Sequence, residues 1–217
     1  MLNGWRGGRK YIDWSIISSM SSYPKGLATR QRLVESMLAL IQLHGYHGTG
    51  LNTVLARSGA PKGSLYFHFP EGKTGLGVAA VGLAGDQFGQ LVSEATTSAP
   101  SPGDVVDALI AELKDMLEAS EYQAGCPVSS VALDAGSENE ELRNACSRVY
   151  DAWVQAVSGY LSTLGLEEGR ALPVATSMIC LVEGSLILSR AHKSTQPLDS
   201  AAGTLKTLLA VHGGAGA

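Results

Sequence analysis

The residues with the clearest capacity for chemistry lie within one short stretch, from residue 62 to residue 73. They combine ammonium, hydroxyl and imidazole groups, which bind phosphate oxygens and base edges, with a glycine that allows a close backbone approach: Lys62, Gly63, Ser64, Tyr66, His68 and Lys73. Leu65 and Phe69 lie four residues apart and place an apolar stripe on the other side of a helix. The stretch therefore predicts a short helix that is buried on one side and binds DNA with the other.

A second apolar pattern, just before this stretch, predicts the element that positions it. Leu51, Val54 and Leu55 follow the i, i+3, i+4 spacing of a helix, and Gly59 can adopt the left-handed conformation common at helix C-termini. Pro61 suits the first turn of the next helix, where its missing N–H would be unpaired anyway. Two short helices joined by a tight turn predict a helix-turn-helix, whose second helix enters the DNA major groove. The predicted DNA-binding set gains two further residues: Thr49 and Asn52.

The run from Lys62 to Phe69, Lys-Gly-Ser-Leu-Tyr-Phe-His-Phe, followed by Lys73, resembles the signature of TetR/AcrR-type transcriptional regulators. The interval from Phe69 to Lys73 is one residue longer than in many members. Together with Gly-Cys-Pro-Val at residues 125–128, it resembles the LmrA-like branch. The resemblance implies a homodimer, formed by a four-helix bundle of the last two helices of each subunit. It also implies a small-molecule effector that moves the two DNA-binding heads apart.

Helical periodicity throughout the chain predicts an all-α fold. Residues 1–23 show no clear pattern and are predicted to form a disordered or arm-like extension, whereas residues 24–74 are predicted to form the three-helix DNA-binding domain. Residues 75–212 form a helical ligand-binding and dimerisation domain. The expected helices span residues 29–44, 73–96, 104–120, 125–135, 139–164, 171–189 and a last helix from 197. Strand-like alternation of convincing length is absent from the sequence.

Charge divides the chain in the same way. Residues 1–75 hold nine Lys and Arg against three Asp and Glu, a net charge of +6, and the remainder carries −10. This asymmetry favours binding of double-stranded DNA at one end only. The three cysteines are far apart in sequence, which indicates buried free thiols in a reducing cytoplasm rather than a zinc site: Cys126, Cys146 and Cys180.

Enzyme signatures are missing from the sequence. The Gly-Lys-Thr run at residues 72–74 lacks the earlier glycine of a nucleotide-binding loop, since Phe67 occupies that position. A nucleophile elbow, a zinc-protease His pair and a dinucleotide fingerprint are also absent. We therefore expect neither enzyme activity nor a cofactor or metal. The alternatives are a helical dimeric interaction module or a small-molecule-binding protein without DNA activity.

The helical domain carries two further predicted sites. Flexible, aromatic and acidic side chains suit a largely apolar effector site with few polar anchors, although a packed core explains each of them singly: Phe88, Met116, Tyr122, Cys126, Trp153, Tyr160, Met178 and Glu183. Residues 171–189 are almost entirely apolar and approach the length of a membrane span, but Glu183 favours a buried interface helix without membrane contact. The predicted dimer contacts are Leu186, Leu198, Leu205 and Leu208.

Two repeating or basic features leave alternatives open. Gly75, Gly82 and Gly89 recur every seven residues, which indicates close helix packing, a compliant connector between the two halves, or both. The segment before Met20 contains basic residues that could reach into the minor groove, namely Arg6, Arg9 and Lys10. The other interpretation is that residues 1–19 result from a start codon assigned too early, or form a loose arm. We expect a chain beginning at Met20 to fold and bind its operator normally.

Overall fold

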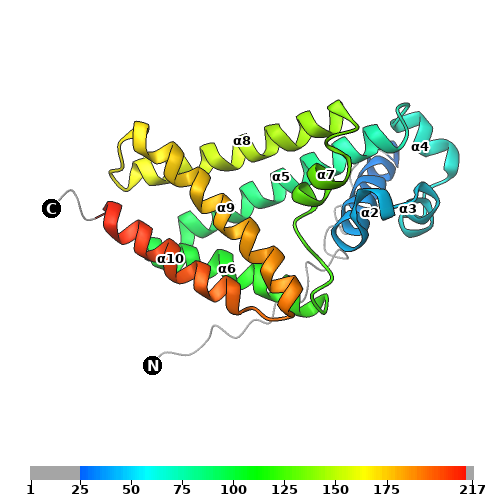
Figure 1. Cartoon of the computed structure of the whole chain (residues 1–217). Helices are drawn as coiled ribbons and strands as arrows, with labels where there is room; N and C mark the ends of the chain where they lie inside the picture. The colour runs from blue at the N-terminus through cyan, green and yellow to red at the C-terminus, as the bar shows by residue number, and fades with distance from the viewer. Residues whose placement is uncertain (1–24, 214–217) are drawn as a thin grey trace, which may run out of the picture.

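The computed structural model describes residues 25–213, with side chains for residues 26–210, and every regular element in that range is a helix. The helices, labelled in Figure 1, are α2 (Lys25–Gly48), α3 (Leu51–Ser58), α4 (Lys62–His68), α5 (Lys73–Ser98), α6 (Pro102–Ala119), α7 (Pro127–Ala135), α8 (Glu140–Thr163), α9 (Glu168–His192) and α10 (Gln196–Gly213). The all-α prediction is confirmed. The predicted arm at residues 1–23, with its basic residues, lies outside the described residues.

Helices α2, α3 and α4 form a small head at one end of the molecule (Figure 1). Its core is built from the apolar stripes of the sequence: Leu33, Met37, Ile41, Val54, Leu65 and Phe69 are all buried. The predicted stop at Gly45 is present as a break in helical geometry, with φ 72° and ψ 175°. Helix α2 begins four residues before the predicted start at residue 29.

The turn between α3 and α4 is held from α2. Gly59 closes α3 in the left-handed conformation, with φ 62°, as predicted. The Arg32 Nε donates a hydrogen bond to the Ser58 carbonyl oxygen at 3.1 Å, which satisfies one of the free carbonyls at the end of α3. Pro61 precedes α4 as an extended residue, with φ −61° and ψ 144°, and is not inside its first turn. Together these contacts fix the angle at which α4 leaves α3.

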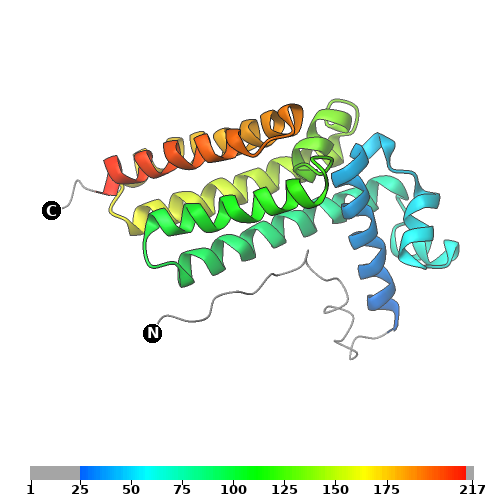
Figure 2. The same cartoon turned by 90° about the horizontal axis from the view of Figure 1, so that it is seen from below.

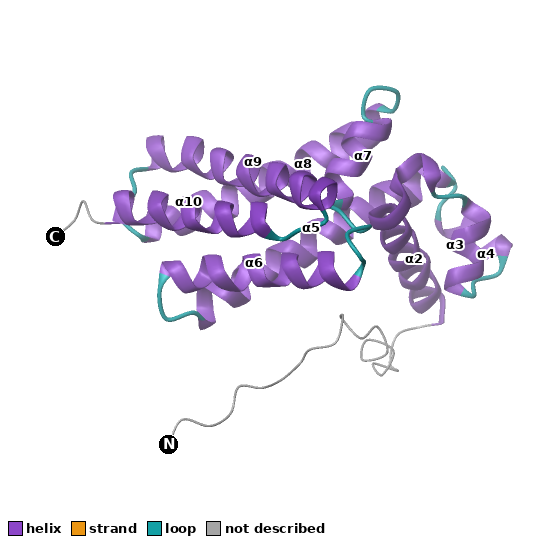
Figure 3. Ribbon diagram, turned by 60° about the horizontal axis from the view of Figure 1, so that its bottom comes forward, coloured by secondary structure: helices purple, strands orange, loops and turns teal. Residues whose placement is uncertain are grey.

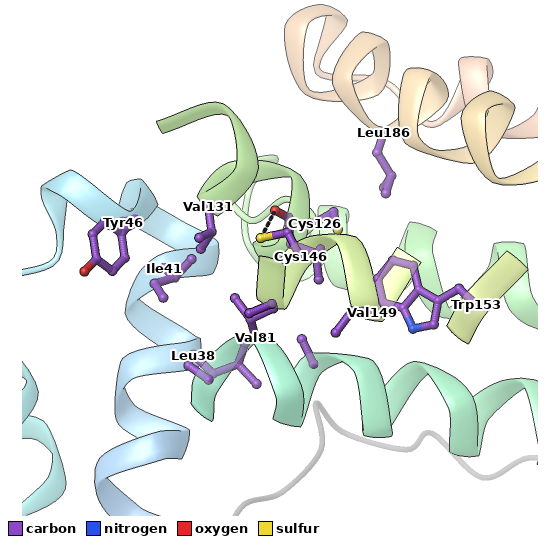
Figure 4. Close-up of a cluster of buried hydrophobic side chains, with 14 of the residues drawn as sticks. Leu38, Ile41, Tyr46, Val81, Cys126, Val131, Cys146, Val149, Trp153 and Leu186 are labelled. Carbon is purple, nitrogen blue, oxygen red and sulfur yellow. Dashed lines mark hydrogen bonds between the residues drawn. The ribbon is translucent and has the colours of Figure 1, made fainter. Parts of the chain in front are cut away.

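Helix α5 belongs to both parts of the molecule, because it packs on α2 near its start and on α8 along its length. Beyond it, α8 packs on α9, α9 on α10, and α10 on α6 (Figures 1 and 2). The core between these helices includes Val81, Val149, Trp153 and Leu186 (Figure 4). The long helices therefore form a bundle with the head at one end.

Helix α9 is only partly covered by this bundle. Among the described residues it is the one helix long and apolar enough to cross a membrane by length and composition, and 22% of its most apolar 18-residue window is buried. Such a helix on a bundle surface, side by side with α10 (Figure 3), leaves an apolar face without cover in the subunit. Its exposed members are Leu172, Cys180, Gly184, Ile187, Leu188 and Ala191.

The predicted dimer contacts need correction on this point. Leu186 is 4% exposed and faces the core (Figure 4), and Leu198 and Leu205 are also buried within the subunit. Leu208 is half-buried. Sequence spacing alone does not distinguish these buried leucines from the exposed side of α9, because leucines on both sides of the helix satisfy the same helical spacing. We call the exposed residues of this helix the α9 face: Leu172, Cys180, Gly184, Ile187, Leu188 and Ala191.

Candidate functional site

The outer side of α4 is exposed in the way the sequence predicts. Leu65 is fully buried, whereas Tyr66 is 51% exposed and Lys62 and Gly63 are exposed. A Cβ atom added to Gly63 would meet nothing within 4 Å, so another molecule can approach the α4 backbone at that point. Ser64 and His68 are half-buried at the edges of this face. Asn52, from α3, is exposed as well.

Phe67 is a member of the exposed face that the sequence-based prediction missed. Its side chain is 79% exposed, and its ring meets the His68 ring edge-on with a centroid distance of 5.0 Å. The signal was present in the helical spacing, because Phe67 lies roughly half a turn away from the buried Leu65 and Phe69. We call Lys62, Gly63, Tyr66 and Phe67, with the half-buried Ser64 and His68, the α4 face.

Thr49 has a structural role and is not part of any exposed DNA-binding surface. It is 1% exposed, and its hydroxyl donates to the Gly45 carbonyl oxygen at 2.7 Å. Its backbone N–H donates to the Tyr46 carbonyl oxygen at 3.2 Å. Both bonds stabilise the break at Gly45, where the helical pattern of α2 is interrupted. The burial of Thr49 therefore argues against a contact between its side chain and DNA.

Lys73 joins two helices, α5 and α2. Its Nζ donates to the His47 carbonyl oxygen at 3.4 Å and lies 4.5 Å from the centroid of the Tyr46 ring. Partial burial lowers the pKa of Lys73, while the nearby Asp134 carboxylate raises it. The lysine thus ties the start of α5 to the end of α2, although its half-buried ammonium keeps contact with the surface.

The end of α2 is also tied to the helical bundle through α7. The Asp134 carboxylate accepts a hydrogen bond from the Tyr46 backbone N–H at 2.9 Å. The backbone carbonyl oxygen of Asp134 lies 2.8 Å from the His47 Nε2. A Cβ atom at Gly45 would collide with the same carboxylate, so this contact depends on glycine. We call these four residues the α2–α7 junction. It connects the head to α7, the helix whose N-cap residue is Cys126.

A buried polar cluster, which we call the Glu183 cluster, lies between α7, α8 and α9 and consists of Cys126, Ser129, Tyr150 and Glu183. The Glu183 carboxyl faces the Cys126 thiol and the hydroxyls of Ser129 and Tyr150. Burial, the largest influence, raises the pKa of Glu183, and these hydrogen-bonding neighbours lower it. Burial also raises the pKa of Cys126 and of Tyr150, with further increases from the Glu183 charge. Glu183 Oε2 is buried and lacks a hydrogen-bond partner among the described residues, which is costly for a carboxyl oxygen.

The remaining predicted effector residues do not all lie together. Phe88 packs against Trp153 with a centroid distance of 4.5 Å, and Trp153 meets Tyr150 edge-on at 5.5 Å. Tyr150, which the prediction missed, therefore joins this aromatic group to the Glu183 cluster. Met116 lies elsewhere, against α2, where the Gln42 amide is 3.8 Å from its sulfur. Three others are half-buried: Tyr122, Tyr160 and Met178.

An open groove of about 720 Å³ runs between α5 and α8. Its wall includes Gly82, Gly89, Arg148 and Trp153, and does not include Glu183. An added Cβ atom at Gly82 or Gly89 would meet nothing within 4 Å, so these glycines open the groove and do not pack closely. Close packing is present at other glycines of α5: Gly77 faces the Tyr46 ring, and Gly85 faces Val149.

Comparisons with known proteins give two family matches, one over the head and one over the helical bundle. Residues 33–80 match the family model described as bacterial regulatory proteins, tetR family, and residues 102–204 match the model described as transcriptional regulator LmrA/YxaF-like, C-terminal domain. The chain is 34% identical over 170 residues to the HTH-type transcriptional regulator LmrA of Bacillus subtilis, covering 78% of this chain and 90% of that protein. It is 32% identical to the regulator YxaF of the same species, covering 78% and 89%.

Solved structures share the fold. A TetR transcriptional regulator from Legionella pneumophila superposes with a TM-score of 0.72, covering 87% of this chain and 99% of that one at 21% identity. The likeness extends over the head and the bundle together, so the arrangement of the two parts is that of the solved regulator.

Proposed function

The chain belongs to the TetR family of bacterial transcriptional regulators, with a C-terminal half of the LmrA/YxaF type, and from this membership we propose a specific mode of action. The protein is a cytoplasmic repressor that binds a near-palindromic operator as a homodimer. A small, largely apolar molecule releases it from the DNA. The observation that carries the proposal is the pair of uncovered surfaces in one subunit, the α4 face and the α9 face.

The α4 face supports the DNA part of the proposal. It presents Lys62 for phosphate, Ser64, Tyr66 and His68 for hydrogen bonds, and Gly63 for close approach, on a helix whose other side is anchored in the head core. In a twofold dimer, two such helices reach successive major grooves, so the operator repeats its half-site in inverted order.

The α9 face supports the dimer. Ile187 and Leu188 are each more than half exposed, and Cys180 and Gly184 lie on the same side of the helix. Contiguous exposed apolar surface of this kind marks a contact with another molecule. The neighbouring outer side of α10 carries small residues that permit close helix approach, namely Ser200, Gly203, Thr204 and Thr207. A second copy of the same two helices covers both sides at once.

The Glu183 cluster supports the effector part. A buried carboxyl oxygen without a partner is satisfied when a ligand donates a hydrogen bond to it, and Tyr150, Phe88 and Trp153 supply flat apolar surface beside it. The effector is therefore a mostly apolar molecule with at least one hydrogen-bond donor, neutral or cationic.

The α2–α7 junction offers a route from that cluster to the head. Cys126 precedes α7, and Asp134 near its other end binds the backbone of α2 next to the break at Gly45. A ligand that displaces α7 alters this contact directly, and α5 carries the movement along the other side. By linkage, a ligand that weakens DNA binding must bind the DNA complex more weakly by the same factor.

A mobility-shift assay with the DNA upstream of the protein's own gene tests the proposal. We expect a retarded complex that survives a large excess of random duplex, and its loss on addition of an effector found by Trp153 fluorescence. Tyr66→Ala should abolish the shift without changing the unfolding temperature, because Tyr66 is exposed. Effector binding without any specific DNA complex would favour the alternative of a small-molecule-binding protein.

A further inference from the structure

Phe67 occupies the centre of the α4 face. On a helix with 3.6 residues per turn, it projects about 160° from Leu65 and about 160° from Phe69, and those two are buried in the head core. Gly63 lies one turn earlier on the same side and carries no side chain. Because the core side of α4 is anchored, the opposite side faces the floor of the major groove when α4 docks.

The exposure of Phe67 is unusual within this molecule. At 79% it is the most exposed large apolar side chain among residues 26–210. The ring cannot donate or accept an ordinary hydrogen bond, so it gains little from phosphates or from most base edges. The ring lies edge-on to the His68 ring, at a centroid distance of 5.0 Å.

Only one group on the floor of the major groove is apolar, the C5-methyl group of thymine. We propose that Phe67 is a specificity-determining residue that reads thymine in each operator half-site by packing on this methyl group. Gly63 permits the approach, because a side chain there would stand between the α4 backbone and the base pairs. The proposal rests on the DNA-binding function proposed above and adds the base that one residue selects.

Removal of the methyl group alone tests the proposal. The full chain is used to select an operator from random duplexes, and each thymine is then replaced by deoxyuridine, which keeps the base pair and loses the methyl. At one symmetric pair of positions, we expect the affinity of the wild type to fall about fourfold per half-site. This is the loss expected when one CH₂-sized apolar group is no longer buried on binding. Phe67→Ala should still bind but no longer distinguish thymine from deoxyuridine there.

Two variants serve as controls. Phe67→Leu keeps an apolar side chain and should retain part of the discrimination. Leu133→Ala removes another highly exposed apolar side chain, on α7, and should discriminate as the wild type does. Phe67→Ala should keep the wild-type unfolding temperature, since its side chain is exposed.

The outcomes separate the two proposals. Equal discrimination by wild type and Phe67→Ala, or no thymine whose methyl group matters to the wild type, overturns the assignment of Phe67 while leaving DNA binding in place. Failure of the full chain to enrich any duplex overturns DNA binding itself, and the role of Phe67 with it.

Discussion

The two surfaces that the chain leaves uncovered, the α4 face and the α9 face, differ in a way that suits the separate partners proposed for them. The α4 face mixes a cation, hydroxyls and aromatic rings on a helix of seven residues. The α9 face is apolar over most of a 25-residue helix, with small residues among the leucines. A polar polyanion with one apolar group per A·T pair suits the first surface, and an identical apolar helix suits the second.

The comparison also shows how each surface is supported. The α4 face rests on a head with few elements, whose turn depends on single contacts such as Arg32 to Ser58. The α9 face rests on the bundle core, where Leu186 and Trp153 are buried. Variants in the first surface should therefore change DNA binding with little effect on folding, whereas adjacent positions on α9 should separate association from folding.

The largest effects are expected from two neighbouring substitutions on α9. Ile187→Asp places a charge in the proposed dimer contact, while Leu186→Asp places one in the subunit core, where an unpartnered buried charge costs several kcal/mol. We expect Ile187→Asp to yield a folded monomer and Leu186→Asp an unfolded or aggregated chain. Sedimentation velocity and circular dichroism measure the two properties. A folded Ile187→Asp dimer at micromolar concentration would contradict the assignment of this face.

The next largest effects are expected at Lys62 and Lys73, the two lysines predicted to bind phosphate, and we expect their alanine variants to differ in stability. Lys62 is exposed on α4, so Lys62→Ala should reduce the slope of log affinity against log salt by about one per subunit without loss of stability. Lys73→Ala removes the hydrogen bond to the His47 carbonyl and the contact with the Tyr46 ring. It should lower the unfolding free energy by roughly 1 kcal/mol. Equal stability of the two variants would argue against the structural role of Lys73.

The Glu183 cluster predicts a pH effect within the bundle. Because burial raises the pKa of Glu183 in the folded state, the folded protein loses stability as pH rises from the ordinary range of a glutamate through that raised value. Glu183→Gln should remove this loss, so its urea midpoint should exceed that of the wild type by a margin that grows as pH rises above about 4, the ordinary range of a glutamate. Glu112→Gln, at an exposed position, is the control. Parallel curves for wild type and Glu183→Gln would contradict the account.

Thiol labelling gives a smaller but direct signal. Cys180 is exposed on the α9 face, whereas Cys126 and Cys146 are buried, and burial raises the pKa of Cys146 to about 11. In the wild-type dimer we expect all three to react slowly with a thiol reagent. In the Ile187→Asp monomer, one thiol per chain should react rapidly, and Cys180→Ser should remove it. Rapid labelling of wild-type Cys180 would place that residue outside the contact.

The sequence was informative wherever local chemistry decides the structure. Gly45, Gly59 and Pro127 interrupt or begin helices near the predicted positions, because backbone conformation there depends on the residue itself. The buried side of α4 followed from Leu65 and Phe69 alone. The prediction of an exposed, DNA-binding α4 therefore needed no knowledge of the rest of the molecule.

Long-range packing could not be predicted in the same way. The burial of Thr49 depends on the break at Gly45, and the position of Lys73 depends on Asp134, which is distant in sequence. The choice between Leu186 and Ile187 as the outward residue depends on where α8 and α10 lie. Tyr150 lies in the Glu183 cluster because three helices converge on Glu183, and that convergence cannot be read from the spacing of residues along the sequence.

The central claim is that one surface of each subunit binds DNA while another binds a second copy of the chain. Sedimentation equilibrium of the full chain with the selected operator duplex tests it most directly. The account predicts two 22.6 kDa chains on each duplex, with the same dimer present before DNA is added. A single chain bound to each duplex, or a free protein that is monomeric at micromolar concentration, would contradict it.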